Sequence, residues 1–154
     1  MKASTLVSIL LEEVDPKLLK AALNTAMRSE NPEHVKMALD LGADVNAPVY
    51  NRFGLKSNTP IVNACIYGHN EVVRLLVQRP DVDVNARAYE DSWTPLYRAV
   101  KWQQVEQVRL LLSHPKIEVN KLVHGYTPMD AALQSTDEIR ALLKRAGAKV
   151  SGQR

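Results

Sequence analysis

A Thr-Pro dipeptide recurs at nearly constant intervals along the chain. It stands at Thr59-Pro60, Thr94-Pro95 and Thr127-Pro128, so that successive copies begin 35 and 33 residues apart. Self-similarity at a fixed period of this size is typical of repeat arrays, in which each small unit buries its apolar face against its neighbours. We therefore expect the 154 residues to fold as a stack of similar units.

Two further patterns keep nearly the same period. A triplet of an acidic residue, Val and Asn ends at Asn46, Asn85 and Asn120. An acidic residue also leads an apolar stripe at four places: Glu33 to Leu39, Glu71 to Val77, Glu106 to Leu112 and Glu138 to Leu143. Because apolar residues at positions i, i+3 and i+4 share one face of a helix, these stripes predict four outer helices.

The Thr-Pro pairs predict where the other helices begin. A Thr hydroxyl can accept a hydrogen bond from a free backbone N–H of the first turn, and Pro at the first helical position lacks an N–H that would have no partner. Asp15-Pro16 and Asn31-Pro32 have the same form, so we expect five such helix starts. Small residues in the inner helices, such as Ala64, Ala99 and Ala132, should let adjacent units approach closely.

The order of these motifs resembles the ankyrin repeat family. Residues 59–77 follow its Thr-Pro-Leu, Gly-His-x-Glu-Val-Val and Leu-Leu-Leu elements, and residues 42–46 read Gly-Ala-Asp-Val-Asn as its units close. The resemblance implies an all-α solenoid of helix-turn-helix units with β-turn fingers. We divide this single domain, residues 1–154, into a capping helix at 1–19, repeats at 20–58, 59–93, 94–126 and 127–150, and a tail at 151–154.

Several departures from the family pattern are visible. The connection from Ala47 to Asn58 is longer than the later ones, which predicts an extended finger. The middle units carry one extra residue where the family has Gly-Ala, around Arg79-Pro80 and His114-Pro115, so their local register is open. We interpret the three Val-Asn asparagines as turn residues that bond the adjacent backbone, although the resemblance also implies that they are candidates for hydroxylation.

Composition argues against several classes of function. Cys65 is the only cysteine, so neither an internal disulfide nor a thiolate zinc site can form, and we expect it to be a small core residue. The formal charge of +3 arises after Thr136, which leaves a balanced body that is a poor platform for nucleic acid. No apolar run is long enough to cross a membrane, and Glu12, Glu13 and Asp15 interrupt the apolar N-terminal stretch before it could act as a secretory signal.

No catalytic arrangement is recognisable. We find no nucleophile beside a base, no metal-binding histidine spacing and no glycine-rich phosphate loop. We therefore expect no catalytic residues, no metal and no cofactor. A cytoplasmic location follows as an expectation, with export to a host or another compartment left open.

The aromatic residues give the most information about function, because none of the eight lies on an expected outer helix. The resemblance places them on the inner helices and fingers, which line one concave side, where large rings are typical binding anchors. The alternative is that rings near turns join one unit to the next, as we expect for Tyr97. The predicted partner-binding residues are Tyr50, Phe53, Tyr67, Tyr89, Trp93, Arg98, Lys101, Trp102 and Tyr126.

These observations favour a non-enzymatic module that binds another protein through a rigid surface, for example as an inhibitor or an effector. We expect the chain to be a monomer on its own, and basic residues among the rings suggest a partner with acidic rim residues. The alternative is an assembly subunit that self-associates through the aromatic face. A small enzyme is the least favoured class.

Overall fold

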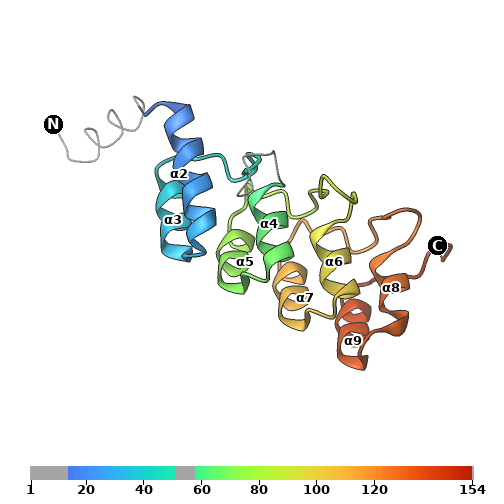
Figure 1. Cartoon of the computed structure of the whole chain (residues 1–154). Coiled ribbons are helices and arrows are strands. Elements are labelled where there is room, and N and C mark those ends of the chain that lie inside the picture. Colours follow the sequence, from blue (N-terminus) through green and yellow to red (C-terminus); the bar gives the residue numbers. More distant parts are fainter. Residues whose placement is uncertain (1–13, 51–57, 154) are drawn as a thin grey trace.

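The computed structural model describes residues 14–50 and 58–153, and these form a stack of four helix pairs (Figure 1). The pairs are α2 (Pro16–Ser29) with α3 (Pro32–Asp40), α4 (Pro60–Tyr67) with α5 (Asn70–Val77), α6 (Pro95–Lys101) with α7 (Val105–Leu112), and α8 (Pro128–Ala131) with α9 (Asp137–Arg145). A short 3-10 helix, η1 (Ala132–Gln134), continues α8. Within the described ranges there is no β-strand, and Val123 and Tyr126 form an isolated bridge. The all-α repeat architecture expected from the sequence is confirmed.

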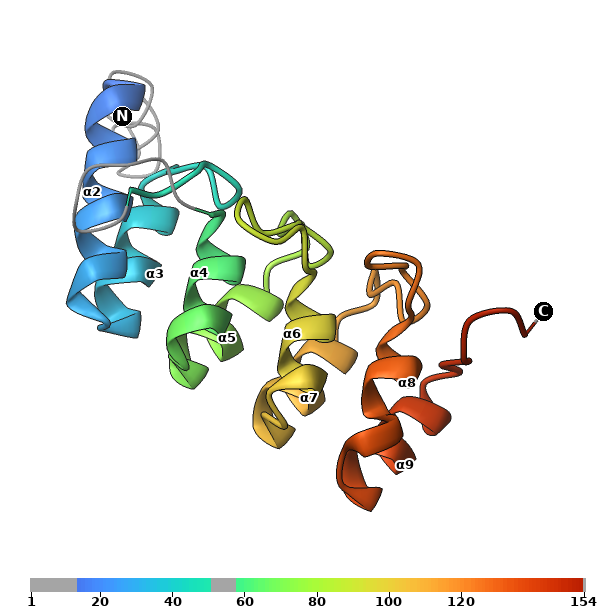
Figure 2. The same cartoon turned by 45° about the vertical axis from the view of Figure 1, so that its right-hand side comes forward.

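The helices form two layers, which Figure 2 shows from the side. The inner layer consists of α2, α4, α6 and α8, and the outer layer of α3, α5, α7 and α9. Within the outer layer each helix packs on the next, from α3 to α5, α7 and α9. All four outer helices predicted from the apolar stripes are present.

All five residue-Pro pairs begin helices, as predicted. Asp15 and Asn31 cap α2 and α3, because their side chains accept hydrogen bonds from the N–H groups of Lys17 (2.8 Å) and Glu33 (2.9 Å). The hydroxyls of Thr94 and Thr127 accept in the same way at α6 and α8. Thr59 differs, because its buried hydroxyl has no hydrogen-bond partner among the described residues.

The ends of the array differ in detail from the expected division. Since Asp15 caps α2 and Pro16 is its first residue, the expected boundary between residues 19 and 20 falls inside this helix. Residues 1–13 of the expected capping helix lie outside the described residues. At the other end, the N–H of Ser151 donates to the Asp130 carboxylate at 3.0 Å, which ties the start of the expected tail to α8.

The core runs through all four units between the two layers. The outer helices contribute side chains with no exposed surface: Val35, Val73, Val108 and Ile139. The inner layer contributes Ala64, Ala99 and Ala132, which are equally buried. Complete burial of each larger aliphatic side chain contributes roughly 1.5 to 3 kcal/mol.

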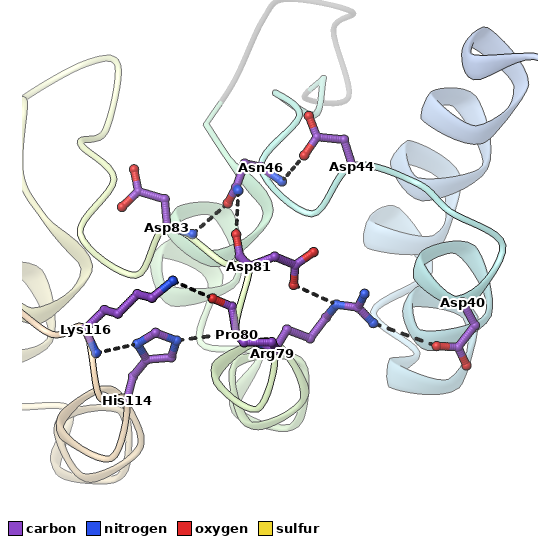
Figure 3. A network of polar contacts seen from close by, with 9 residues as sticks. All are labelled: Asp40, Asp44, Asn46, Arg79, Pro80, Asp81, Asp83, His114 and Lys116. Atoms are coloured by element: carbon purple, nitrogen blue, oxygen red, sulfur yellow. Dashed lines mark hydrogen bonds and ion pairs between the residues drawn. The ribbon is translucent and has the colours of Figure 1, made fainter.

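The Val-Asn asparagines join successive units. The Nδ2 of Asn46 donates to the carbonyl of Asp81 at 2.8 Å, and its Oδ1 accepts from the N–H of Asp83 at 2.7 Å (Figure 3). The same pair of bonds recurs in the next two turns, from Asn85 to Lys116 and Glu118, and from Asn120 to Gly147 and Lys149. The partners therefore belong to the following unit, because stacking brings equivalent turns side by side.

Hydrogen bonds also join the two middle units around Arg79-Pro80 and His114-Pro115, where each unit carries one extra residue. His114 is buried, and its Nδ1 accepts from the N–H of Lys116 at 3.1 Å, so its Nε2 carries the proton and donates to the carbonyl of Arg79 at 3.3 Å. The Lys116 ammonium also donates to the carbonyl of Pro80 at 2.9 Å. Figure 3 shows these contacts next to the asparagine bonds.

Candidate binding face

Tyr67 and Trp102 occupy equivalent positions in adjacent units. Tyr67 ends α4 and Trp102 follows α6, and in both units the next residue is left-handed, Gly68 with φ 75° and Gln103 with φ 55°. The two rings therefore leave the inner layer at the same place, one unit apart. They are 56% and 63% exposed, which is unusually open for side chains of this size.

A hollow of about 390 Å³ lies between these two positions. Its lining includes the exposed Tyr67 and Trp102 and the half-buried Arg98, while the buried Cys65 and Gln107 lie at its base. The Gln107 Nε2 donates to the carbonyl of Cys65 at 3.4 Å and to the Oδ1 of Asn70 at 3.2 Å. Its Oε1 has no donor among the described residues, so the base holds an unsatisfied acceptor.

A second hollow of about 430 Å³ lies between α2 and α4. Its apolar lining includes Met27 and Val49, and its aromatic lining includes Tyr50 and Tyr67. Tyr67 borders both hollows, which therefore adjoin on the side of the stack where the inner helices end and the chain turns into the outer ones, near Gly68 and Gln104. We call this side the inner face. It combines exposed rings with recesses that could accept side chains of a partner.

Two more of the predicted rings are exposed on the fingers. Tyr89 is 79% exposed and Tyr126 is 58% exposed. The fingers that carry them are fastened to each other, because Arg87 donates to the carbonyl of Leu122 at 2.8 Å and His124 contacts the carbonyl of Asp91 at 2.8 Å. These rings are therefore presented by connected loops.

Trp93 is engaged within the chain. Its half-buried ring meets the buried Tyr97 edge-on, with 5.2 Å between the ring centroids, and the guanidinium of Arg98 lies 5.2 Å from the Trp93 centroid. Arg98 also forms an ion pair with Asp91. Tyr97 thus packs inside the array as expected, whereas partner contact by Trp93 and Arg98 stays a prediction.

The remaining predicted site residues fall into three situations. Tyr50 is half-buried, with the ammonium of Lys20 at 5.3 Å from its ring centroid and its N–H donating to Asn24 Oδ1 at 2.7 Å. Lys101 is exposed next to Trp102. Phe53 lies outside the described residues.

The two layers differ in charge, a feature that the sequence analysis missed. Of the inner helices, α2, α4 and α6 carry Lys17, Lys20, Arg28, Arg98 and Lys101 and contain no Asp or Glu, while α8 carries Asp130 and no cation. Every outer helix carries at least one carboxylate. The signal was in the sequence, but counting charge along the chain hides it, because inner and outer helices alternate.

The described residues contain neither a reactive cysteine nor a metal-binding cluster. Burial raises the pKa of the Cys65 thiol to about 12, and the positive charge of Arg98 opposes this only in part, so the thiol stays protonated. In the part of the chain that the structure describes, no cluster of three or more His, Cys, Asp or Glu residues is arranged to hold a metal ion. The described helices are also too short or too polar to span a bilayer.

Comparison with known families agrees with the repeat pattern. Residues 49–123 match the family model of ankyrin repeats, which has three copies. No curated protein matches the sequence at a significant level. The helix pairs on either side of the match, α2 with α3 and α8 with α9, continue the same stack. Residues 49–123 therefore consist of ankyrin repeats.

Proposed function

We propose that the protein is a non-enzymatic module that binds another protein through its inner face and fingers. Ankyrin repeats generally mediate protein–protein interaction, and the family is typically non-enzymatic. The observation that carries the proposal is the pair of exposed rings, Tyr67 and Trp102, which flank a recess in adjacent units. A surface held by stacked helices binds with little loss of conformational entropy, so an inhibitor or an effector role is compatible with it.

A reducing compartment suits this chain. Its one cysteine is buried and unpaired, so the fold depends on no disulfide. We accordingly assign the binding function to the cytoplasm.

A double variant tests the proposed face. Tyr67→Ala with Trp102→Ala should abolish capture of the proteins that the wild type retains from a cell extract. Because both rings are mostly exposed, Trp102→Ala alone should change the free energy of unfolding by only about 0.5 kcal/mol. Affinity capture with quantitative mass spectrometry measures the first effect, and urea denaturation measures the second.

The matched control is Glu71→Ala with Lys144→Ala, two exposed residues of outer helices. It should retain the same proteins as the wild type. If the ring variant is folded and still captures every protein, the inner face is not the binding surface. If its melting temperature falls sharply instead, the rings belong to the core.

Self-association is the second candidate function. The exposed side chains of Leu18, Met37 and Leu41 surround a hollow of about 520 Å³ that is lined only by residues of the first described helix pair and Leu41 behind it. An exposed apolar patch of this kind suits contact between copies. Light scattering distinguishes the candidates. If the wild type is a dimer and Met37→Glu dissociates it, the dimer interface lies at this end of the stack. If the Tyr67→Ala, Trp102→Ala variant dissociates it instead, the dimer interface lies on the inner face.

A further inference from the structure

We propose that the segment bound by the inner face is acidic, and that it places an aromatic side chain in the hollow between Tyr67 and Trp102. This inference rests on the proposed function and specifies the chemistry of the partner. It follows from how charge is divided between the two layers and from the composition of the hollow.

Part of the positive charge on the inner face is not paired with a carboxylate of the described residues. Of the cations on α2, α4 and α6, Arg98 is paired with Asp91 of a finger. Lys101 is exposed and takes part in none of the ion pairs found between described residues. Lys20 contacts the face of the Tyr50 ring and likewise forms no ion pair in the described ranges. Neither lysine lines a hollow itself, but each adjoins a ring that does, because Lys20 contacts Tyr50 and Lys101 precedes Trp102.

Most carboxylates of the helices lie on the opposite layer, where ion pairs between neighbouring helices match several of them. On the inner side, Asp130 of α8 accepts hydrogen bonds from Thr127 and Ser151, and Glu30 lines the hollow between α2 and α4. Arg74 of α5 binds Glu106 of α7 at 2.6 Å, and Arg109 of α7 forms an ion pair with Glu138 of α9. An approaching acidic segment therefore meets a positive inner layer and a balanced outer one. Complementary charge of this kind steers encounter and orients a partner, while contributing less to the final affinity than buried rings do.

The hollow between Tyr67 and Trp102 could bind an aromatic side chain of the partner. Two exposed rings face a recess of about 390 Å³, so an inserted aromatic side chain would gain ring contacts on both sides. The base contains no carboxylate, and its two buried residues, Cys65 and Gln107, are neutral. Arg98 also lines the hollow, but its guanidinium is already paired with Asp91, so an inserted carboxylate would lose its hydration and would have to compete with Asp91 for this cation. This favours a ring at this point and carboxylates around it.

Selection from a random library of 12-residue peptides displayed on phage tests the inference while the partner is unidentified. The full chain is the target, and peptides that also bind the Tyr67→Ala, Trp102→Ala variant are removed. We expect the enriched sequences to contain several Asp or Glu residues around a Tyr, Trp or Phe. Enrichment of neutral or basic sequences would overturn the acidic partner while keeping the binding face, whereas no enrichment that depends on the two rings would overturn the proposed function as well.

A charge reversal then locates the contact. With the best selected peptide labelled for fluorescence anisotropy, Lys101→Glu should raise the dissociation constant at least tenfold, and added salt should weaken binding to the wild type. The matched control, Lys144→Glu, makes the same change of charge on the exposed surface of α9 and should alter affinity less than twofold. Equal effects of the two reversals would show that only net charge matters and would contradict the inference.

A single-stranded thymidine oligonucleotide serves as the second probe, since it is also anionic and carries rings. We expect it to bind at least tenfold more weakly than the selected peptide at the same ionic strength. Equal affinity would mean that the inner face attracts any polyanion, and the proposed acidic peptide would be withdrawn.

Discussion

At the scale of single residues, burial determines the protonation and the reactivity of the Cys65 thiol. The thiol is buried on α4, and removal from water raises its pKa to about 12, from the ordinary value of 9.0. The folded chain therefore keeps this proton at pH values at which the unfolded chain releases it. A position where the family has a second small residue becomes an inert part of the core.

The shifted pKa predicts a loss of stability in alkali. Because the unfolded state binds fewer protons than the folded state above about pH 9, the free energy of unfolding should fall as pH rises from there towards 12, by roughly 1 kcal/mol per pH unit for this group. Cys65→Ala removes the effect, while the lysines and tyrosines titrate equally in both proteins. Urea denaturation under reducing conditions at pH 8, 9 and 10 checks the prediction, and parallel curves for the two proteins would refute it.

Sequence reasoning works unevenly at this scale. Burial of Cys65 and Tyr97 was predictable because their positions in the unit are fixed by the repeat. The direction of the Trp93 ring was not, because it depends on Arg98, which is held by Asp91 two residues before that ring. Spacing along the chain places a residue on a finger, but local contacts determine whether its side chain turns outward.

At the scale of elements, the turns show what the sequence of a single unit cannot predict. The Val-Asn triplets predicted turns, and the turns are present, but each asparagine binds the backbone of the unit that follows. A single turn contains no information about this partner, because the partner is some 30 residues away and becomes adjacent only after stacking. Helix starts were easier to predict, since a cap and its N–H lie within three residues of each other.

Asn85→Ala should therefore cost more than a change in an isolated turn. It removes two hydrogen bonds, of 2.8 and 2.9 Å, and leaves the carbonyl of Lys116 and the N–H of Glu118 without these partners. We expect a loss of about 2 kcal/mol in the free energy of unfolding, measured by urea denaturation.

Asn120→Ala is the matched comparison. It removes the equivalent bonds to Gly147 and Lys149, but this turn is more exposed, so water can replace them and the loss should be smaller, about 1 kcal/mol. Equal losses at the two positions would mean that burial of the turn is unimportant.

At the scale of the whole molecule, the period of the sequence predicted the stack, but the character of its two faces emerged only from the structure. The family match covers residues 49–123, and the flanking pairs extend the same layers despite weaker motifs, such as α2, which lacks Thr-Pro. Once each helix is assigned to a layer, exposed rings and unmatched cations coincide on one side. Neither property is visible in the average composition of the chain.

Stacking also predicts how the molecule unfolds. Leu111 of α7 and Leu143 of α9 are both fully buried, so replacing either with Ala should cost about 2 to 5 kcal/mol. Among the described helices of the outer layer, α7 packs between α5 and α9, whereas α9 packs against α7 alone. Each unit of such an array is stabilised mainly by its nearest neighbours. The two substitutions should therefore destabilise different sets of neighbouring units.

We expect Leu111→Ala to lower amide protection in α4 to α9 together, since it weakens the unit that joins both sides of the stack. Leu143→Ala should expose the amides of α8 and α9 while those of α4 to α6 keep most of their protection. Hydrogen exchange followed by mass spectrometry of peptic fragments resolves the two patterns. A uniform loss of protection in both variants would show that the array unfolds as one cooperative body, and the nearest-neighbour description of this chain would then be wrong.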